Sequence, residues 1–177
     1  MKKYELTAEF IEKWGKKLFR IKALISFGSV EVGELGGYVE KEDNLAQDGD
    51  AWVYGNAEVY GDARVCGDAR VCGNARVCGD ARVYGNAWVC GNADYLLIGR
   101  IGSRFSFTTF FKNKDKGITV SCGCFLGTIA EFRAKVTDTH GNNKHAKMYN
   151  LAADMAELQI LGEEYFDKLN TNKSEPF

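Results

Sequence analysis

The sequence has almost no net charge, no long apolar run and only two histidines, and each shortage excludes a class of function. Twenty-four acidic and 23 basic residues give a net charge of −1, which provides no field for binding a nucleic-acid polymer. No apolar run approaches the roughly eighteen residues that cross a membrane, and no signal-like apolar segment follows the first three residues. We therefore expect a soluble, cytoplasmic protein with no membrane partner.

A six-residue phrase occurs seven times in succession between Gly49 and Cys90, beginning with Gly49-Asp-Ala-Trp-Val-Tyr54. Alanine and valine stand two positions apart in every phrase, so both lie on one face of a short strand, and glycine supplies the turn. Such a short strand cannot bury its apolar face alone. The period therefore predicts a solenoid whose interior is filled by alanine and valine side chains.

The phrase resembles the hexapeptide repeat of left-handed β-helix proteins, in which three hexapeptides form one triangular coil. We therefore expect a mainly β chain with a left-handed parallel β-helix at its centre. The expected parts are an N-terminal β cap at 1–32, the β-helix at 33–102, a C-terminal α+β module at 103–170 and a tail at 171–177.

The C-terminal module has a different pattern from the repeats. Two apolar segments around a polar turn predict a β-hairpin over 105–125. A capping box at Thr128 predicts a helix that ends at Gly141, and a second helix is expected from about Lys144 to Ile160. The order is therefore ββαα. The second helix is expected to carry its apolar side on Met148, Leu151, Met155 and Leu158.

Residues eighteen positions apart stack in neighbouring coils, so the outward positions between alanine and valine form three columns. The columns are Trp52, Arg70 and Trp88; Glu58, Arg76 and Asp94; and Arg64, Arg82 and Arg100. In the first column we expect a guanidinium between two indoles. Two exposed indoles on one small face favour a subunit interface over a ladder that only stiffens the solenoid. The resemblance adds that many hexapeptide proteins are trimers, so a homo-oligomer is expected, with a trimer favoured.

Cysteine use indicates packing rather than cross-linking. Four of the six cysteines occupy a repeat position that tyrosine also fills, namely Cys66, Cys72, Cys78 and Cys90 beside Tyr54, Tyr60 and Tyr84. This exchange is typical of half-exposed packing residues. We therefore expect reduced thiols in a cytoplasm.

Two further groups of residues are candidates for chemistry. Many left-handed β-helix proteins are acyl-CoA-dependent acyltransferases that use a histidine as general base, but His140 and His145 both lie outside the repeats. Capping or solvated roles are favoured for them, so acyl transfer remains the alternative to a non-enzyme. Cys122 and Cys124 with these histidines are weak candidates for a zinc shell. The expectation is no metal and no cofactor.

The flanks of the repeat carry a second resemblance. The stretches from Leu35 to Leu45 and from Asp94 to Gly141 resemble small phage and prophage proteins of unassigned activity. The resemblance implies a mobile-element origin and a bacterial host. We therefore expect a non-enzymatic binding scaffold that binds a host protein or sequesters a small anionic, nucleotide-like metabolite. A self-assembling filament protein is a further alternative.

Guanidinium and hydroxyl groups gather just after the last repeat, where they suit the recognition of phosphate or carboxylate. The candidate ligand-binding residues are Arg100, Ser103, Arg104, Thr108 and Thr109. The same groups can instead satisfy buried backbone, and the sequence leaves both interpretations open.

Overall fold

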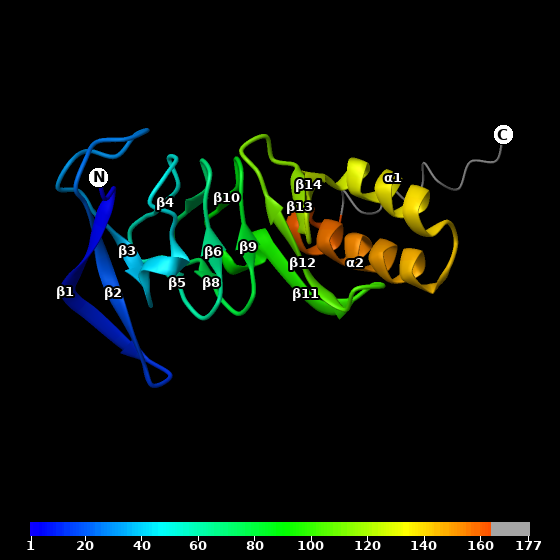
Figure 1. Ribbon diagram of the computed structural model, residues 1–177, viewed down its shortest axis with the longest axis horizontal. Coiled ribbons are helices and arrows are strands. Elements are labelled where there is room, and N and C mark those ends of the chain that lie inside the picture. Colours follow the sequence, from blue (N-terminus) through cyan, green and yellow to red (C-terminus); the bar gives the residue numbers. More distant parts are fainter. Residues whose placement is uncertain (164–177) are drawn as a thin grey trace. The chain divides into compact units, whose positions relative to one another are not determined.

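The computed structural model describes residues 1–163, and the chain is mainly β (Figure 1). It divides into two compact units, Met1–Asn92 and a second unit that begins at Ala93. No helix in the described residues is long and apolar enough to cross a membrane.

Short strands of the first unit stack in parallel, as the repeat predicts. The strands are β4 (Trp52–Val53), β5 (Glu58–Val59), β6 (Arg64–Val65), β7 (Arg70–Val71), β8 (Arg76–Val77), β9 (Arg82–Val83) and β10 (Trp88–Val89). The pairs are β4–β7–β10, β5–β8 and β6–β9, and partners stand eighteen residues apart. The repeat alanines and valines are at most 1% exposed. The solenoid and its alanine and valine interior are therefore confirmed.

An N-terminal hairpin joins this solenoid at its first coil. Strands β1 (Tyr4–Lys13) and β2 (Lys16–Ala23) pair antiparallel, and β2 pairs with β3 (Leu35–Val39), which runs parallel to β5. A short 3-10 helix, η1 (Glu42–Asn44), follows β3. A side chain at Gly37 would meet the carbonyl oxygen of Ala57 at 2.5 Å, so glycine is what allows β3 to approach the coil.

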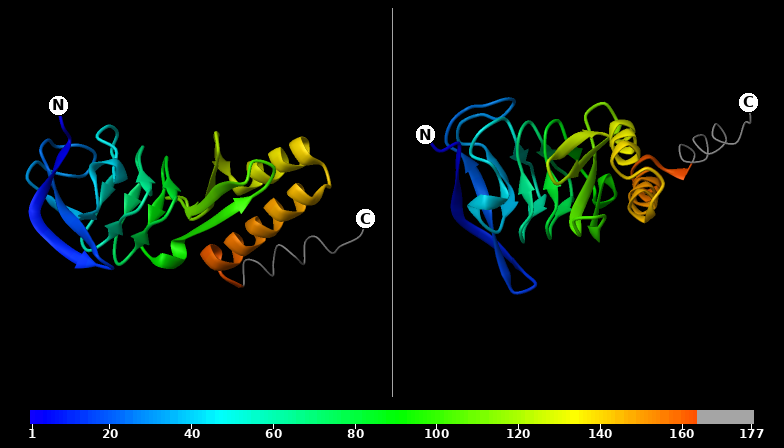
Figure 2. Two further views of the ribbon diagram at one scale, coloured as in Figure 1. Left: turned by 60° about the horizontal axis from the view of Figure 1, so that its bottom comes forward. Right: turned by 45° about the vertical axis from the view of Figure 1, so that its right-hand side comes forward.

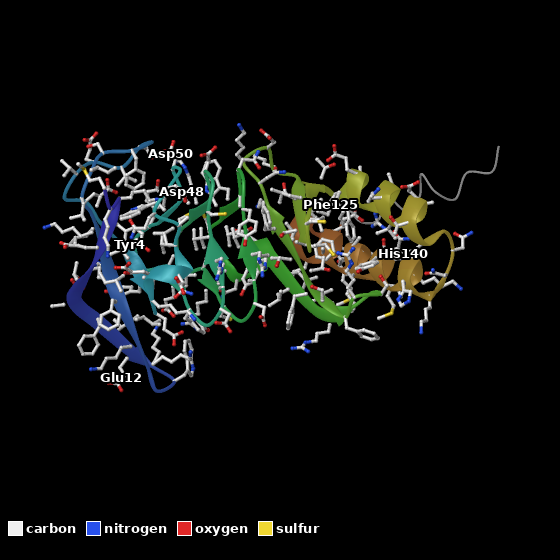
Figure 3. All side chains as sticks on the ribbon, viewed as in Figure 1. Tyr4, Glu12, Asp48, Asp50, Phe125 and His140 are labelled. Atoms are coloured by element: carbon white, nitrogen blue, oxygen red, sulfur yellow. A yellow bond between two sulfur atoms is a disulfide. The ribbon has the colours of Figure 1, made fainter. Side chains whose placement is uncertain are left out.

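The Lys3 side chain supplies hydrogen-bond donors to backbone carbonyls in the first coil of the solenoid. Figure 3 labels Tyr4, Asp48 and Asp50 in this part of the chain. Its ammonium is buried and donates to the carbonyl oxygens of Asp48, Gly49 and Ala51 at 3.2, 3.1 and 2.9 Å. Burial lowers the pKa of Lys3, while the carboxylates of Asp48 and Asp50 act in the opposite direction. The Lys3 ammonium thus takes the place of the N–H donors that a preceding coil would supply to these carbonyls.

The prediction that Trp52 and Trp88 are both exposed is wrong for Trp52. Residues Trp52, Arg70 and Trp88 do stand side by side, but Trp52 is fully buried while Trp88 is 45% exposed. The rings of Tyr4 and Phe27 meet Trp52 edge-on at 6.1 and 5.4 Å. The repeat period does not indicate which coil the N-terminal residues cover, and Tyr4 and Phe27 cover the first.

The rest of this column also differs from the expected stack. The Arg70 guanidinium lies over the ring of Tyr54 at 6.0 Å. With Trp52 removed from the surface, the expected subunit interface rests on Arg70 and Trp88, and it stays a prediction.

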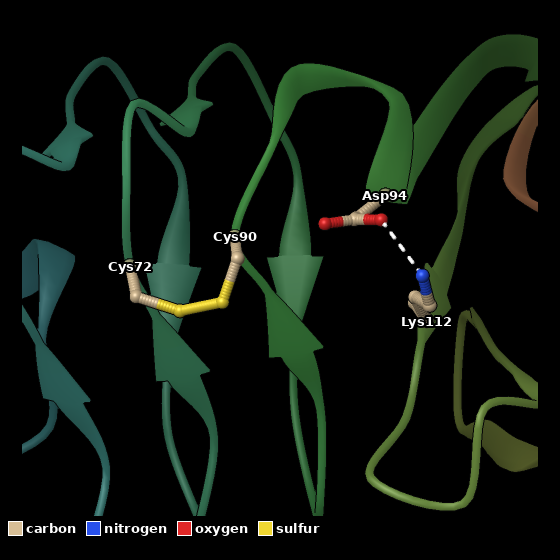
Figure 4. The surroundings of a disulfide bond; sticks show 4 residues. All are labelled: Cys72, Cys90, Asp94 and Lys112. Atoms are coloured by element: carbon tan, nitrogen blue, oxygen red, sulfur yellow. Dashed lines mark hydrogen bonds and ion pairs between the residues drawn. A yellow bond between two sulfur atoms is a disulfide. The ribbon is translucent and has the colours of Figure 1, made fainter.

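Cysteines on neighbouring coils form a disulfide that the sequence analysis did not expect (Figure 4). Cys72 and Cys90 stand eighteen residues apart in the chain, and their Cα atoms are 4.3 Å apart. The expectation of reduced thiols is therefore wrong for this pair. Stacking places equivalent positions of adjacent coils about one strand spacing apart, roughly 4.8 Å, which is within reach of a disulfide.

The second unit is an antiparallel sheet with two helices, as Figure 2 shows. After a 3-10 turn, η2 (Asn92–Asp94), its strands are β11 (Tyr95–Ile101), β12 (Ser106–Lys112), β13 (Ile118–Cys122) and β14 (Phe125–Thr128), paired in sequence order. The solenoid therefore does not extend to residue 102, because β11 pairs antiparallel with β12, and Arg100 does not continue the column of Arg64 and Arg82. The ββαα expectation is corrected to four strands and two helices.

Both helices follow their predicted bounds closely. Helix α1 (Ile129–His140) begins at a capping box in which the Thr128 hydroxyl accepts from the Glu131 backbone N–H at 3.2 Å. Helix α2 (Lys144–Leu161) begins after Asn143, whose side chain accepts from two backbone N–H groups.

The predicted apolar side of α2 is wrong. Its buried side is made mainly of small residues and includes Ala146, Tyr149, Ala152, Ala153 and Ala156. Met148, Leu151, Met155 and Leu158 are exposed. Alanine lets the helix axis approach the sheet closely, so the larger side chains on the opposite side remain outside the core.

Trp52 and Trp88 belong to one column but differ in burial, so together they test how Tyr4 and Phe27 cover Trp52. We expect Trp52→Ala to lower the free energy of unfolding by about 3–5 kcal/mol, because it leaves a cavity under Tyr4 and Phe27. Trp88→Ala should lower it by no more than about 1 kcal/mol, because Trp88 is half exposed. Urea unfolding measures both, and equal losses would contradict the buried position of Trp52.

Thiol titration tests the disulfide. Six cysteines less the bonded pair leave four thiols, so denatured protein prepared without reductant should react with four equivalents of a thiol reagent. Cys72→Ser should release Cys90 and give five, whereas Cys66→Ser should give three. Six reactive thiols in the parent protein would show that the pair is reduced.

Candidate functional site

A pocket of about 410 Å³ lies within the second unit, and we call it the Tyr149 pocket. Its walls come from the turn after β11, the start of β12, the β13–β14 turn, α1 and α2. The lining residues are Ser103, Arg104, Ser106, Cys122, Gly123, Cys124, Phe125, Phe132, Lys135, Val136, Thr139, His140 and Tyr149. Phe125 and His140 are labelled in Figure 3.

Aromatic side chains form the inner wall of the Tyr149 pocket. Phe132 and Val136 lie one turn apart on α1, so both point from the helix toward the sheet. The Phe132 ring meets Phe125 at 5.7 Å and Tyr149 edge-on at 5.6 Å. These rings belong to, or pack against, the core of the second unit, so the wall is held in place by packing.

The charged side chains that line the pocket are both basic, although Lys135 also pairs with the Asp138 carboxylate, which is not a lining residue, at 3.3 Å. Arg104 from the turn after β11 and Lys135 from α1 bring permanent positive charges, and both residues are exposed. No carboxylate is among the lining residues in the described part of the chain. The surroundings therefore favour an anion, which would receive charge-assisted hydrogen bonds from these two side chains.

Tyr149 contributes a neutral hydroxyl to the pocket. Burial raises its pKa to about 12, and the adjacent Cys122 thiol acts in the same direction, while Arg104 opposes them. Thr108 hydroxyl and Cys122 sulfur are 3.2 Å apart, which links the buried strand β12 to the same wall. Tyr149 thus remains a hydrogen-bonding phenol at neutral pH.

His140 ends α1 and lies against the Tyr149 ring. The two rings stack with centroids 5.8 Å apart and an angle of 26° between their planes. The predicted capping or solvated role does not describe the place of His140, which lies in the pocket wall. An imidazole held flat against a phenol offers one face and its edge to a ligand.

Gly102 permits the close approach of the β11 end to Tyr149. Its φ angle is +74°, and a side chain there would meet the Tyr149 hydroxyl oxygen at 1.9 Å. Glycine at this position therefore lets the turn carrying Ser103 and Arg104 pass beside the phenol.

The structure places two of the five candidate ligand-binding residues in the wall of the pocket. Ser103 and Arg104 line the pocket, but Arg100, Thr108 and Thr109 do not. Thr108 and Thr109 are buried in β12, opposite Cys122 and Ser121 of β13. Arg100 lies over the ring of Phe107 at 5.7 Å.

Lys135, Thr139 and Tyr149 line the pocket but are not among the residues predicted from the sequence. Lys135 and Thr139 are four residues apart on the predicted first helix, next to the apolar positions Phe132 and Val136, and this spacing was the available signal. Nothing local in the sequence indicates that Tyr149 of the second helix meets them.

The four residues considered for a zinc shell do not form one in the described part of the chain. The rings of His140 and His145 are 5.7 Å apart, and Cys122, Cys124 and His140 all border the pocket. Within residues 1–163, however, no three histidine, cysteine or acidic side chains converge closely enough to hold a metal ion.

Comparison with protein families identifies the repeat. Residues 63–79 and 75–91 match the YdcK beta solenoid repeat. The chain therefore contains a β-solenoid repeat region, in agreement with the stacked strands of the first unit. The YdcK-type match covers less than half of the chain and lies outside the Tyr149 pocket. Curated proteins give no match.

Two glycines test the geometry of the pocket wall. Gly102 and Gly123 both have positive φ angles, +74° and +61°, but a side chain at Gly123 meets nothing within 4 Å. We expect Gly123→Ala to cost about 1–2 kcal/mol from backbone strain alone. Gly102→Ala should cost more, by about 1–3 kcal/mol, because it also displaces Tyr149. Thermal unfolding compares them, and equal losses would contradict the contact at Tyr149.

Proposed function

We propose that this chain is a non-enzymatic binding protein whose Tyr149 pocket holds a small anionic ligand with an aromatic or apolar part, such as a nucleotide. One observation carries the proposal: Arg104 and Lys135 place two positive charges on a pocket whose inner wall is aromatic. The volume of about 410 Å³ suits a small molecule rather than a folded partner.

Each part of such a ligand has a matching group. Phosphate or carboxylate oxygens accept from Arg104 and Lys135, and each charge-assisted contact contributes about 1.5–3 kcal/mol. A flat ring packs against Phe125 or the exposed side of His140. The hydroxyls of Ser103, Ser106 and Tyr149 supply hydrogen bonds that orient it.

Binding without turnover is favoured over acyl transfer by the surroundings of His140. A histidine that works as a general base is normally oriented by a carboxylate, and none lines this pocket in the described residues. His140 is instead held by stacking on Tyr149.

The remaining features of the chain fit a scaffold. Three sets of parallel strands related by eighteen residues support a left-handed parallel β-helix of the hexapeptide type. Arg70 and Trp88 remain exposed on one side of it and are open to a partner. Together with the resemblance to phage and prophage proteins, this supports a protein that sequesters a host metabolite.

Calorimetric titration with nucleoside mono- and diphosphates tests the proposed ligand class. Arg104→Ala and Lys135→Ala should each weaken binding by roughly 10- to 150-fold, which corresponds to the loss of one charge-assisted contact. Arg100→Ala is the matched control, since Arg100 has the same charge, lies four residues from Arg104 and does not line the pocket. It should bind like the parent protein.

Two results would contradict this proposal. Equal losses in Arg100→Ala and Arg104→Ala would mean that charge near β11 matters and the pocket does not. Absence of binding across the panel, in a parent protein that melts cooperatively, would direct attention to a host protein as partner.

A further inference from the structure

Helix α2 carries an exposed apolar stripe along its outer side. Met148, Leu151, Met155 and Leu158 are 39%, 64%, 57% and 44% exposed. Their spacing of three, four and three residues places them on one face of the helix. An apolar face of this kind on an otherwise charged surface is typical of an interaction site.

The stripe is complementary to itself. Its four residues are symmetric about position 153, with Leu151 and Met155 two residues from that point and Met148 and Leu158 five residues from it. Two copies of α2 laid antiparallel therefore bring Leu151 of one copy against Met155 of the other, and Met148 against Leu158. A two-fold interface requires this kind of reciprocal pairing.

The charges at the ends of α2 favour the same arrangement. Lys144 and Lys147 lie in the first turn and are exposed, although the N-terminal end of a helix disfavours cations. No basic residue lies in the last turn, and the exposed Glu163 follows the helix. In an antiparallel pair, each lysine-bearing end lies beside the negative end and Glu163 of the other copy.

We infer that α2 is a dimer interface, in which the stripe of one chain packs antiparallel against the stripe of a second copy. The stripe spans most of an 18-residue helix, about 27 Å long, which is enough for a small interface. A single helix pair is a small interface compared with that of an obligate dimer, so we expect the association to be reversible. The Tyr149 side of α2 stays inside each unit, so the inference does not depend on the proposed ligand.

Sedimentation equilibrium of the full chain over a range of micromolar concentrations tests the inference. The parent protein should pass from monomer to dimer. Leu151→Asp should weaken dimerisation roughly 100-fold, because two carboxylates enter the apolar centre of the interface. Val32→Asp is the control, since Val32 is also 64% exposed but lies in the first unit, and it should dimerise like the parent.

A double variant tests the orientation. In Leu151→Asp/Met155→Lys, antiparallel packing places an aspartate of one copy against a lysine of the other, so dimerisation should recover at least tenfold relative to Leu151→Asp. Parallel packing would place like charges together and give no recovery. Circular dichroism melts establish that each variant is folded, and Met148→Asp replaces Leu151→Asp if that variant is not.

Three outcomes would overturn the inference. The first is a parent protein that stays monomeric at every concentration. The second is a trimer or other oligomer whose mass is unchanged by Leu151→Asp and Met148→Asp, which would assign assembly to another surface. The third is the loss of dimer in Leu151→Asp without recovery in the double variant, which would exclude the antiparallel pair.

Discussion

Backbone hydrogen bonding from coil to coil is the constraint on which the first unit depends. Each short strand receives its partners from the strand eighteen residues away, as in the bond from the Trp52 N–H to the Ala69 carbonyl at 3.0 Å. A stack of this kind leaves unpaired carbonyls at its end. The Lys3 ammonium donates to three of these carbonyls, and the rings of Tyr4 and Phe27 cover Trp52. The first coil is thereby part of a core rather than an open surface.

The second unit depends on the close packing of helix α2 against the sheet and the end of β11. Alanines on the inner side of α2 bring the helix near the sheet, and Gly102 allows the β11 end to pass beside Tyr149. The space that remains between the larger residues of α1 and the β13–β14 turn is the Tyr149 pocket. The same use of alanine in the core leaves the large apolar residues of α2 on the outside, so the Tyr149 pocket and the proposed dimer face have one cause.

Features with a period were predictable from the sequence. The repeat gave the strand positions, the stacking register and the buried alanines and valines, and the capping box at Thr128 placed the start of α1 within one residue. Failures occurred where contacts come from distant parts of the chain. Trp52 looks like any outward residue of the repeat, and its burial depends on Tyr4 and Phe27. The apolar stripe of α2 was mistaken for its core side because periodicity identifies a face without saying what it meets.

Only the part of the candidate site that comes from one local segment was predictable from the sequence. Arg104 and Ser103 were found because guanidinium and hydroxyl groups cluster locally, whereas Lys135 and Tyr149 reach the pocket from two helices that the sequence cannot place. Nuclear magnetic resonance of the isotope-labelled full chain, titrated with a nucleoside diphosphate, tests the central claim most directly. The account predicts that signals of Arg104, Lys135 and Tyr149 shift in a saturable manner while those of the repeat residues stay unchanged. Shifts confined to the solenoid, or none at all, would contradict it.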